Sequence, residues 1–165
     1  MKKILVEKIA RIIKNHRKLE KILNLKITNR GREVFLDGEG GDEYLGGKVV
    51  EALDFGFPFS SAVAIKKEEM EFEVINIKDH TKRNDLKTIR ARLIGRSGKA
   101  LKTLSNLTDC FIELKDNKIS IIGFPESIES ARMAIILIIQ GSKHSNAYKF
   151  LEKHRPEEIL DLGLK

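Results

Sequence analysis

The most informative segment of this chain is Leu93-Ile94-Gly95-Arg96-Ser97-Gly98-Lys99. Two glycines bracket two polar residues, between a basic segment with apolar residues at helical spacing and a second amphipathic segment. Because glycine has no Cβ, the backbone at such a turn can approach a ligand closely. The first amides of a following helix attract an anion. The segment therefore predicts a phosphate-binding turn between two helices.

Basic residues gather around this turn. The 165-residue chain has 31 Lys and Arg against 24 Asp and Glu, a net charge of +7 that suits a polyanionic partner. Between Thr81 and Thr103 only Asp85 is acidic. The basic residues of that stretch are Lys82, Arg83, Lys87, Arg90, Arg92, Arg96, Lys99 and Lys102. This clustering favours a nucleic acid over other polyanions.

Composition excludes several other classes of protein. A hydrophobic content of 41% supports a real core. The single Cys110 excludes an internal disulfide framework, and the four histidines show no metal-ligand spacing. No signal peptide or long apolar span is evident. We therefore expect a soluble, cytoplasmic protein with no metal ion, no cofactor and no membrane partner.

The second half of the chain predicts the order strand, helix, GxxG turn, helix, strand, strand, helix. The supporting patterns are alternation over 71–77, helical spacing at Leu86, Ile89 and Leu93 and at Leu101, Leu104 and Leu107, strands at 111–114 and 119–122 around Asp116-Asn117, and a helix from Pro125 to Gly141. From Ser142 onward the sequence is polar and is interpreted as a tail.

The first half predicts a similar order. Its patterns are a strand at 4–6, helical spacing over 9–23, strands at 25–27 and 34–36, a loop over 38–47, a helical face over 49–55 and a short helix over 60–67. The chain therefore contains two copies of one arrangement.

The second-half order, with its GxxG turn, resembles a type I KH domain over roughly Glu71 to Gly141. KH domains clamp about four nucleotides with the GxxG loop. The resemblance implies an α+β fold of two tandem type I KH-like domains. Each would be βααββα, with a three-stranded antiparallel sheet packed on helices. The implied domains are 1–68 and 69–154, with a tail at 155–165.

The first half resembles a KH domain whose loop has lost its glycines. Ile13-Lys14-Asn15-His16-Arg17 occupies the place of the loop, and an alternative alignment puts Ala10 to Ile13 there. Neither segment contains a glycine. This half still carries basic helical residues, so it either contacts an RNA backbone or serves as a scaffold.

Two further stretches resemble the Krr/Dim/Pno family of small-ribosomal-subunit assembly factors, in a compact archaeal-like form. They are Val49 to Leu53 followed by Gly56 to Ala62, and Arg132 to Ile135 leading to Gly141-Ser142. The resemblance implies binding to the 3′ region of small-subunit rRNA. It also implies work with a PIN-domain endonuclease and contact with a translation initiation factor subunit.

The predicted RNA-binding residues follow from the turn and its surroundings. The two glycines admit phosphates, nearby amides donate to them, and basic side chains attract them. Of Arg90 and Arg92, two residues apart on a helix, only one is expected to face RNA. The full set is Ile94, Gly95, Arg96, Ser97, Gly98, Lys99, Lys102, Arg92, Arg90 and Ile112. Ile94, Leu101 and Ile112 could form an apolar floor for the bases, although core packing is favoured for Leu101 and is equally open for Ile94.

Other functions fit less well. The GK pairs at Gly47-Lys48 and Gly98-Lys99 lack both the earlier glycine and the following Ser or Thr of a nucleotide-binding P-loop. No catalytic constellation is visible, so we expect no enzyme. A protein-interaction adaptor that recruits a nuclease or translation factor stays open, whereas general mRNA binding is weakened by the absence of an S1-like barrel.

Overall fold

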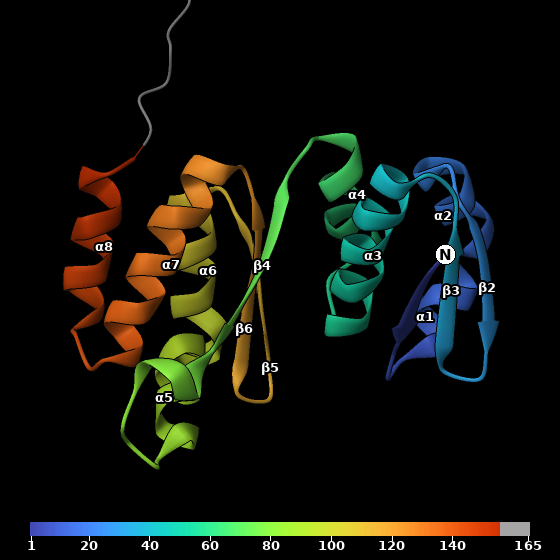
Figure 1. Ribbon diagram of the computed structural model, residues 1–165. Helices are drawn as coiled ribbons and strands as arrows, with labels where there is room; N and C mark the ends of the chain where they lie inside the picture. The colour runs from blue at the N-terminus through green and yellow to red at the C-terminus, as the bar shows by residue number, and fades with distance from the viewer. Residues whose placement is uncertain (156–165) are drawn as a thin grey trace, which may run out of the picture.

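The computed structural model describes residues 1–155 and contains two three-stranded antiparallel sheets, each covered by helices (Figure 1). This confirms the predicted α+β class with two KH-like units. Residues 156–165, which make up nearly all of the predicted tail, lie outside the described residues.

The first half has the strand order β1-β3-β2. Its elements are β1 (Lys2–Leu5), α1 (Ile9–Lys14), α2 (His16–Leu23), β2 (Lys26–Arg30), β3 (Glu33–Asp37), α3 (Gly40–Phe55) and α4 (Phe59–Lys67). Alternation in β2 and β3 places Ile27, Val34 and Leu36 on the buried face, where they pack against the helices.

The second half repeats this topology with the order β4-β6-β5. Its elements are β4 (Glu71–Asn76), the 3₁₀ turn η1 (Ile77–His80), α5 (Leu86–Ile94), η2 (Arg96–Gly98), α6 (Lys99–Thr108), β5 (Phe111–Lys115), β6 (Lys118–Gly123), α7 (Pro125–Ile139) and α8 (His144–Lys153). In both halves the third strand lies at the centre, so the strand that precedes it is a sheet edge.

The predicted loop over 38–47 is wrong, because α3 begins at Gly40. Glycine normally disfavours a helix interior, which misled the sequence interpretation. A Cβ at Gly46 would lie 2.3 Å from Cδ1 of Leu25. Glycine at this position therefore lets the helix approach its neighbours closely, and packing outweighs propensity.

The second sheet lies against α3 and α4 of the first half, so the layers alternate helix, sheet, helix, sheet (Figure 1). Ile122 of β6 packs in the first-half core. The rings of Phe57 and Phe72 meet edge to face at 6.0 Å across this boundary. Lys115 pairs with Glu7 at 2.7 Å. The sheet surface that faces away from α5, α6 and α7 is thus covered by the first half.

The charge of a first-half arginine also acts on a carboxyl group of the second sheet. Burial raises the pKa of Glu113 on β5, and the Arg11 guanidinium of α1 opposes the rise.

The polar stretch from Ser142 is not a tail over its described part, because α8 packs on α6 and α7. It occupies the place that α4 takes in the first half. The second sheet covers the corner before α4, where Phe57 is fully buried. The equivalent Ser142 before α8 is only half-buried, and α8 lies at the outer end of the molecule (Figure 1). A helix whose outer face meets water needs few apolar residues.

Replacement of Leu151 by Ala should destabilise the protein strongly. Leu151 is 2% exposed within the second-half core, and such a truncation costs about 2–5 kcal/mol. Urea denaturation measures this loss. Leu5→Ala is the matched control, because Leu5 is 70% exposed and its truncation should change stability by less than about 0.5 kcal/mol. Equal effects would contradict the packing of α8.

Candidate nucleic-acid interface

The GxxG turn has a backbone that only glycine tolerates at its first position. Gly95 has φ 76° and ψ 176°, and its amide donates to the Ala91 carbonyl at 2.8 Å. A Cβ on Gly95 would lie 2.6 Å from the main-chain nitrogen of Ala100. Gly98 is left-handed at φ 76° and ψ 11°, with open space around it. The two glycines therefore have different roles. Gly95 permits the backbone conformation of the turn, and Gly98 leaves the surface of the turn free of side-chain atoms.

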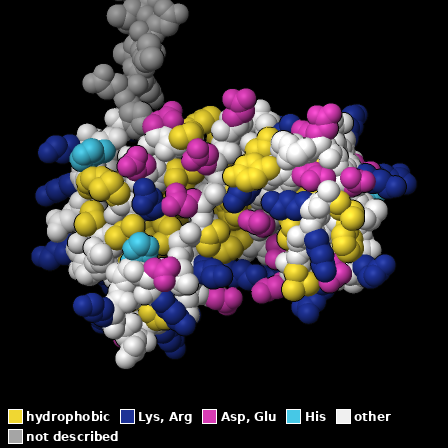
Figure 2. Space-filling view, in the orientation of Figure 1, with side chains coloured by type: hydrophobic (Ala, Val, Ile, Leu, Met, Phe, Trp, Pro, Cys, Tyr) yellow, Lys and Arg dark blue, Asp and Glu magenta, His cyan; other side chains and the backbone are white. Residues whose placement is uncertain are grey.

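The turn exposes its basic side chains to solvent. Arg96, Ser97, Lys99 and Lys102 are all exposed around the start of α6. Figure 2 shows basic side chains at the end of the second half where α5 lies, at the lower left. The positive end of the α6 dipole adds to their field. This corner of the molecule is built to attract an anion.

Two of the predicted amide donors are already used inside the turn. The Gly98 amide donates to Gly95 O at 3.2 Å, and the Lys99 amide donates to Arg96 O. Phosphate binding here must therefore rely on close approach, the helix dipole and basic side chains more than on these two amides.

The two predicted floor residues have different surroundings. Ile94 is 38% exposed beside the turn, as a contact residue would be. The side chain of Ile112 is 7% exposed and packs in the second-half core. Because β5 is an edge strand, the main chain of Ile112 still lies at the sheet edge. Leu101 packs against the core, which confirms the packing role favoured for it.

Neither predicted arginine of α5 presents an unengaged guanidinium. Arg90 donates to Oδ1 of Asn117, in the β5–β6 turn, at 2.8 Å. Arg92 donates to the carbonyls of Ile138 at 2.6 Å and Ser142 at 2.5 Å. The expectation that one of the pair faces RNA therefore differs from the geometry. These partners lie 27 to 50 residues away in sequence, so helical spacing could not reveal them.

The one acid of the basic stretch caps a helix. Asp85 accepts from the hydroxyl of Thr88 at 2.6 Å and from its amide at 3.4 Å. These hydrogen bonds lower the pKa of Asp85. An N-cap carboxylate stabilises the start of α5, so this residue has a structural reason to be acidic in a basic segment.

The lone cysteine is packed away from solvent. Burial raises the pKa of Cys110 to about 11, so it stays a thiol at neutral pH. Its side chain lies behind β6, where a Cβ at Gly123 would meet Sγ at 2.5 Å. Cys110 therefore serves close packing.

The first half carries a different turn at the equivalent place. The break between α1 and α2 falls at Asn15, which has φ −109°. This supports the alignment over 13–17, and the alternative at 10–13 is wrong because it lies inside α1. The edge of β2 is occupied by the chain itself: the Ile27 amide donates to Glu20 at 3.0 Å, and its carbonyl accepts from His16 at 2.6 Å.

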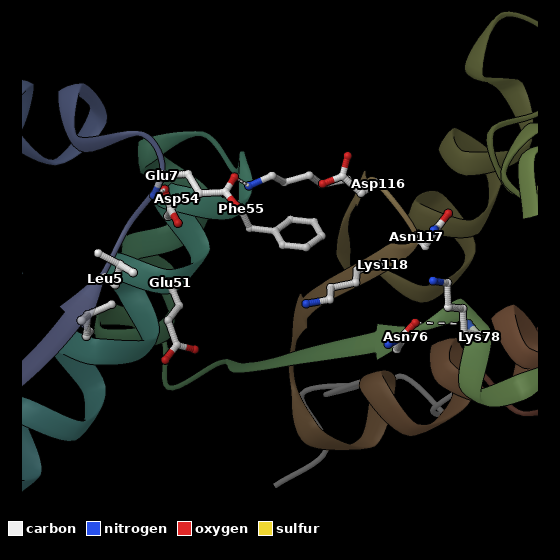
Figure 3. Close-up of a pocket in the computed structure, with 12 residues that line it drawn as sticks. Leu5, Glu7, Glu51, Asp54, Phe55, Asn76, Lys78, Asp116, Asn117 and Lys118 are labelled. Atoms are coloured by element: carbon white, nitrogen blue, oxygen red, sulfur yellow. Dashed lines mark hydrogen bonds and ion pairs between the residues drawn. The ribbon is translucent and has the colours of Figure 1, made fainter. Parts of the chain in front are cut away.

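A cleft of about 390 Å³ separates the halves on the side of the β5–β6 turn (Figure 3). One wall bears Glu7, Glu51 and Asp54, and the other bears Lys78 and Lys118. The mixed charge of its lining does not favour a polyanion. None of the helices within residues 1–155 is long and apolar enough to cross a membrane.

Comparison with known proteins follows the same division of the chain. Residues 71–156 match the family model for the second KH domain of PNO1, described as a eukaryotic-type KH domain (KH-domain type I). A KH domain-containing protein of Methanocaldococcus jannaschii is 31% identical over 108 residues, covering 65% of this chain and 48% of that one. Pre-rRNA-processing protein PNO1 of Debaryomyces hansenii is 30% identical over 143 residues, covering 81% and 54%. The chain thus spans about half the length of these curated relatives.

Solved structures agree over almost the whole chain. Dim2p from Pyrococcus horikoshii has a TM-score of 0.85 and 26% identity, covering 92% of this chain and 98% of that one. The a/eIF2alpha-aDim2p-rRNA complex from the same organism gives 0.83 and 26%, with 92% of each chain covered. A tandem KH topology, a GxxG turn in the second unit and the matched family model lead to one assignment: this chain belongs to the PNO1 family of type I KH-domain proteins.

Proposed function

We propose that this chain binds single-stranded RNA in the 3′ region of small-subunit rRNA during ribosome assembly and pre-rRNA processing, and that it acts by binding rather than catalysis. The observation that carries this proposal is the backbone conformation of Gly95, which forms a turn with little side-chain cover beside exposed basic residues. Relatives named pre-rRNA-processing proteins and a structural neighbour solved with rRNA support it.

In this proposal each part of the turn has a distinct role. The RNA backbone crosses Gly95 to Gly98, and Arg96, Lys99 and Lys102 neutralise its phosphates. Each neutralised phosphate contributes about −0.7 to the slope of log affinity against log salt for a single strand. Bases lie over Ile94 toward the main chain of β5. With an aromatic content of 6%, ring stacking is not the main source of affinity.

The domain limits are part of the proposal. We assign 1–68 to the unit without glycines and 69–154 to the unit that grips RNA, with a tail at 155–165. The linker between them follows α4, and α8 closes the second unit. We place the protein in the cytoplasm, where small subunits of an archaeal-like cell are assembled.

A second role as a protein adaptor is favoured by one observation on the first half. Glu20 and His16 occupy the β2 edge at Ile27, so this half is less suited to read bases there. Its exposed surface would serve a PIN-domain endonuclease or a translation initiation factor subunit. The initiation factor a/eIF2alpha is named in the neighbouring complex. Capture of either partner that survives nuclease treatment supports this role, whereas complete loss contradicts it.

The test of the RNA role is crosslinking in cells followed by sequencing of the bound RNA. We expect enrichment at the 3′ end of small-subunit rRNA. A titration of the full chain with a labelled oligonucleotide of that end, against a scrambled oligonucleotide of equal length, measures the preference directly. A broad spread over mRNA would overturn the rRNA assignment, and equal affinities would overturn sequence preference.

A further inference from the structure

The strongest unexplained feature of the second half is a closed set of hydrogen bonds among α5, α7 and α8. The Arg92 side chain donates to the carbonyl of Ile138 in the last turn of α7 and to that of Ser142 in the connection to α8. In return, Nε2 of His144, the first residue of α8, lies 2.7 Å from the Arg92 carbonyl. Because a carbonyl only accepts, the proton of the His144 ring is on Nε2.

Two of these three contacts reach carbonyls in the last turn of a helix, Ile138 in α7 and Arg92 in α5, and the third reaches Ser142 in the corner between α7 and α8. The last carbonyls of a helix have no partner inside it and carry the negative end of its dipole. Arg92 supplies a cation to the end of α7, and His144 supplies a donor to the end of α5. The chain turns back at Gly141, where φ is 102°, and the Ser142 amide donates to Leu137 O at 2.9 Å. The corner between α7 and α8 is therefore well defined.

The α5 carbonyl that His144 contacts lies one helical turn before the GxxG motif. The Arg92 carbonyl precedes Gly95 by three residues, and the Gly95 amide closes the same last turn of α5 on Ala91 O. Any shift of the Arg92 carbonyl moves the point at which the chain leaves α5. The direction of the bare turn depends on that point.

We infer that Arg92 and His144 are positioning residues for the GxxG turn, and that α8 acts on RNA binding through them without touching RNA. The inference rests on the proposed RNA function for its binding readout. It also assigns a role to the segment after Ser142 whose sequence reads as a polar tail. Loss of a positioning residue should leave the slope of log affinity against log salt unchanged, whereas loss of a phosphate contact should lower its magnitude.

The experiment uses the full chain with His144→Ala, His144→Gln and Arg92→Met, and titrates a labelled single-stranded RNA at several salt concentrations. Loss of one positioning hydrogen bond should weaken binding by about fivefold for His144→Ala, with the salt slope unchanged. Glutamine retains an N–H donor, so His144→Gln should recover most of the affinity. Arg96→Gln, which removes a contact residue, should lower the magnitude of the slope by about 0.7.

His154→Ala is the matched control, because Nδ1 of His154 lies 2.9 Å from Phe150 O within α8 and does not reach α5. It should bind like the unmodified chain. Hydrogen exchange of the Gly95 and Gly98 amides, measured without RNA, gives an independent readout. The exchange should be faster in His144→Ala and unchanged in His144→Gln and His154→Ala.

Two results would overturn the inference. One is unchanged affinity and unchanged amide exchange in His144→Ala. The other is a drop of about 0.7 in the slope magnitude for Arg92→Met, which would make Arg92 a phosphate contact. If the unmodified chain shows no salt-dependent RNA binding, the proposed function fails, while the exchange measurement still tests the positioning.

Discussion

Gly95→Ala is expected to weaken RNA binding strongly and to destabilise the second half. At φ 76° and ψ 176° the residue lies in a region that is essentially restricted to glycine. A side chain there also meets the Ala100 main-chain nitrogen at 2.6 Å, and backbone cannot move aside as a flexible side chain could. The turn must therefore refold. We expect stability to fall by on the order of 3 kcal/mol and affinity to fall about 100-fold.

The second glycine of the motif provides an internal comparison. Gly98 is left-handed, and a Cβ there meets nothing within 4 Å. Gly98→Ala should cost only about 1–2 kcal/mol of backbone strain and a smaller part of the affinity. Gly41→Ala is the neutral control, because Gly41 lies in the first turn of α3 with open space around it. Urea denaturation and RNA titration should show the largest loss of stability and affinity for Gly95→Ala, a smaller loss for Gly98→Ala and none for Gly41→Ala.

If Gly95→Ala binds RNA as well as Gly98→Ala does, the special geometry of the first glycine is not needed. That result would contradict the assignment of the turn as the RNA grip. If the lost binding instead equals the fraction of protein that is unfolded, Gly95 contributes to stability and has no separate role in binding RNA.

The double replacement Arg96→Asp with Ser97→Asp should weaken RNA binding by on the order of 100-fold at low salt while the fold survives. A charge 4 Å from a phosphate near a protein surface is worth about 4 kcal/mol before screening, and here its sign is reversed. Ser97 is left-handed at φ 56°, a conformation that aspartate adopts more readily than most residues. Both glycines remain, so the turn keeps its backbone.

The control carries the same change in net charge at two solvent-exposed positions of the first half. Ser60→Asp with Lys67→Asp alters two exposed residues of α4 and should leave most of the affinity intact. Circular dichroism confirms that both variants are folded. Equal weakening by the two double variants would mean that only total charge matters, and no weakening by the first would sink the claim that the turn contacts phosphate.

Much of the fold could be predicted because its signals are local. Alternation over 71–77, the turn residues Asp116-Asn117 and helical spacing at Ile89 and Leu93 each describe contacts within a few residues. The order of elements follows from them, and it matches the observed topology. The glycines of the GxxG motif were equally readable, since the need for glycine is a property of the backbone itself.

The predictions from sequence are wrong where packing between distant segments outweighs local secondary-structure propensity. Gly46 is tolerated inside α3 because the side chain of Leu25, between α2 and β2, packs where a Cβ would lie. The segment after Ser142 forms α8 although its outer surface is polar, since Ala147 and Leu151 are buried and Tyr148 and Phe150 pack against the same core. Arg92 looked like a phosphate ligand and instead holds the end of α7. In each case the deciding partner lies far away in sequence.

Hydrophobic periodicity and backbone sterics act over short distances, so the two-copy arrangement, the βααββα order and the single glycine turn follow from local sequence alone. Which basic residues are available at the turn depends instead on contacts between distant segments. A guanidinium is equally compatible with a phosphate and with the carbonyls at a helix end. The folded chain brings those carbonyls to Arg92, and it leaves Arg96, Lys99 and Lys102 facing solvent.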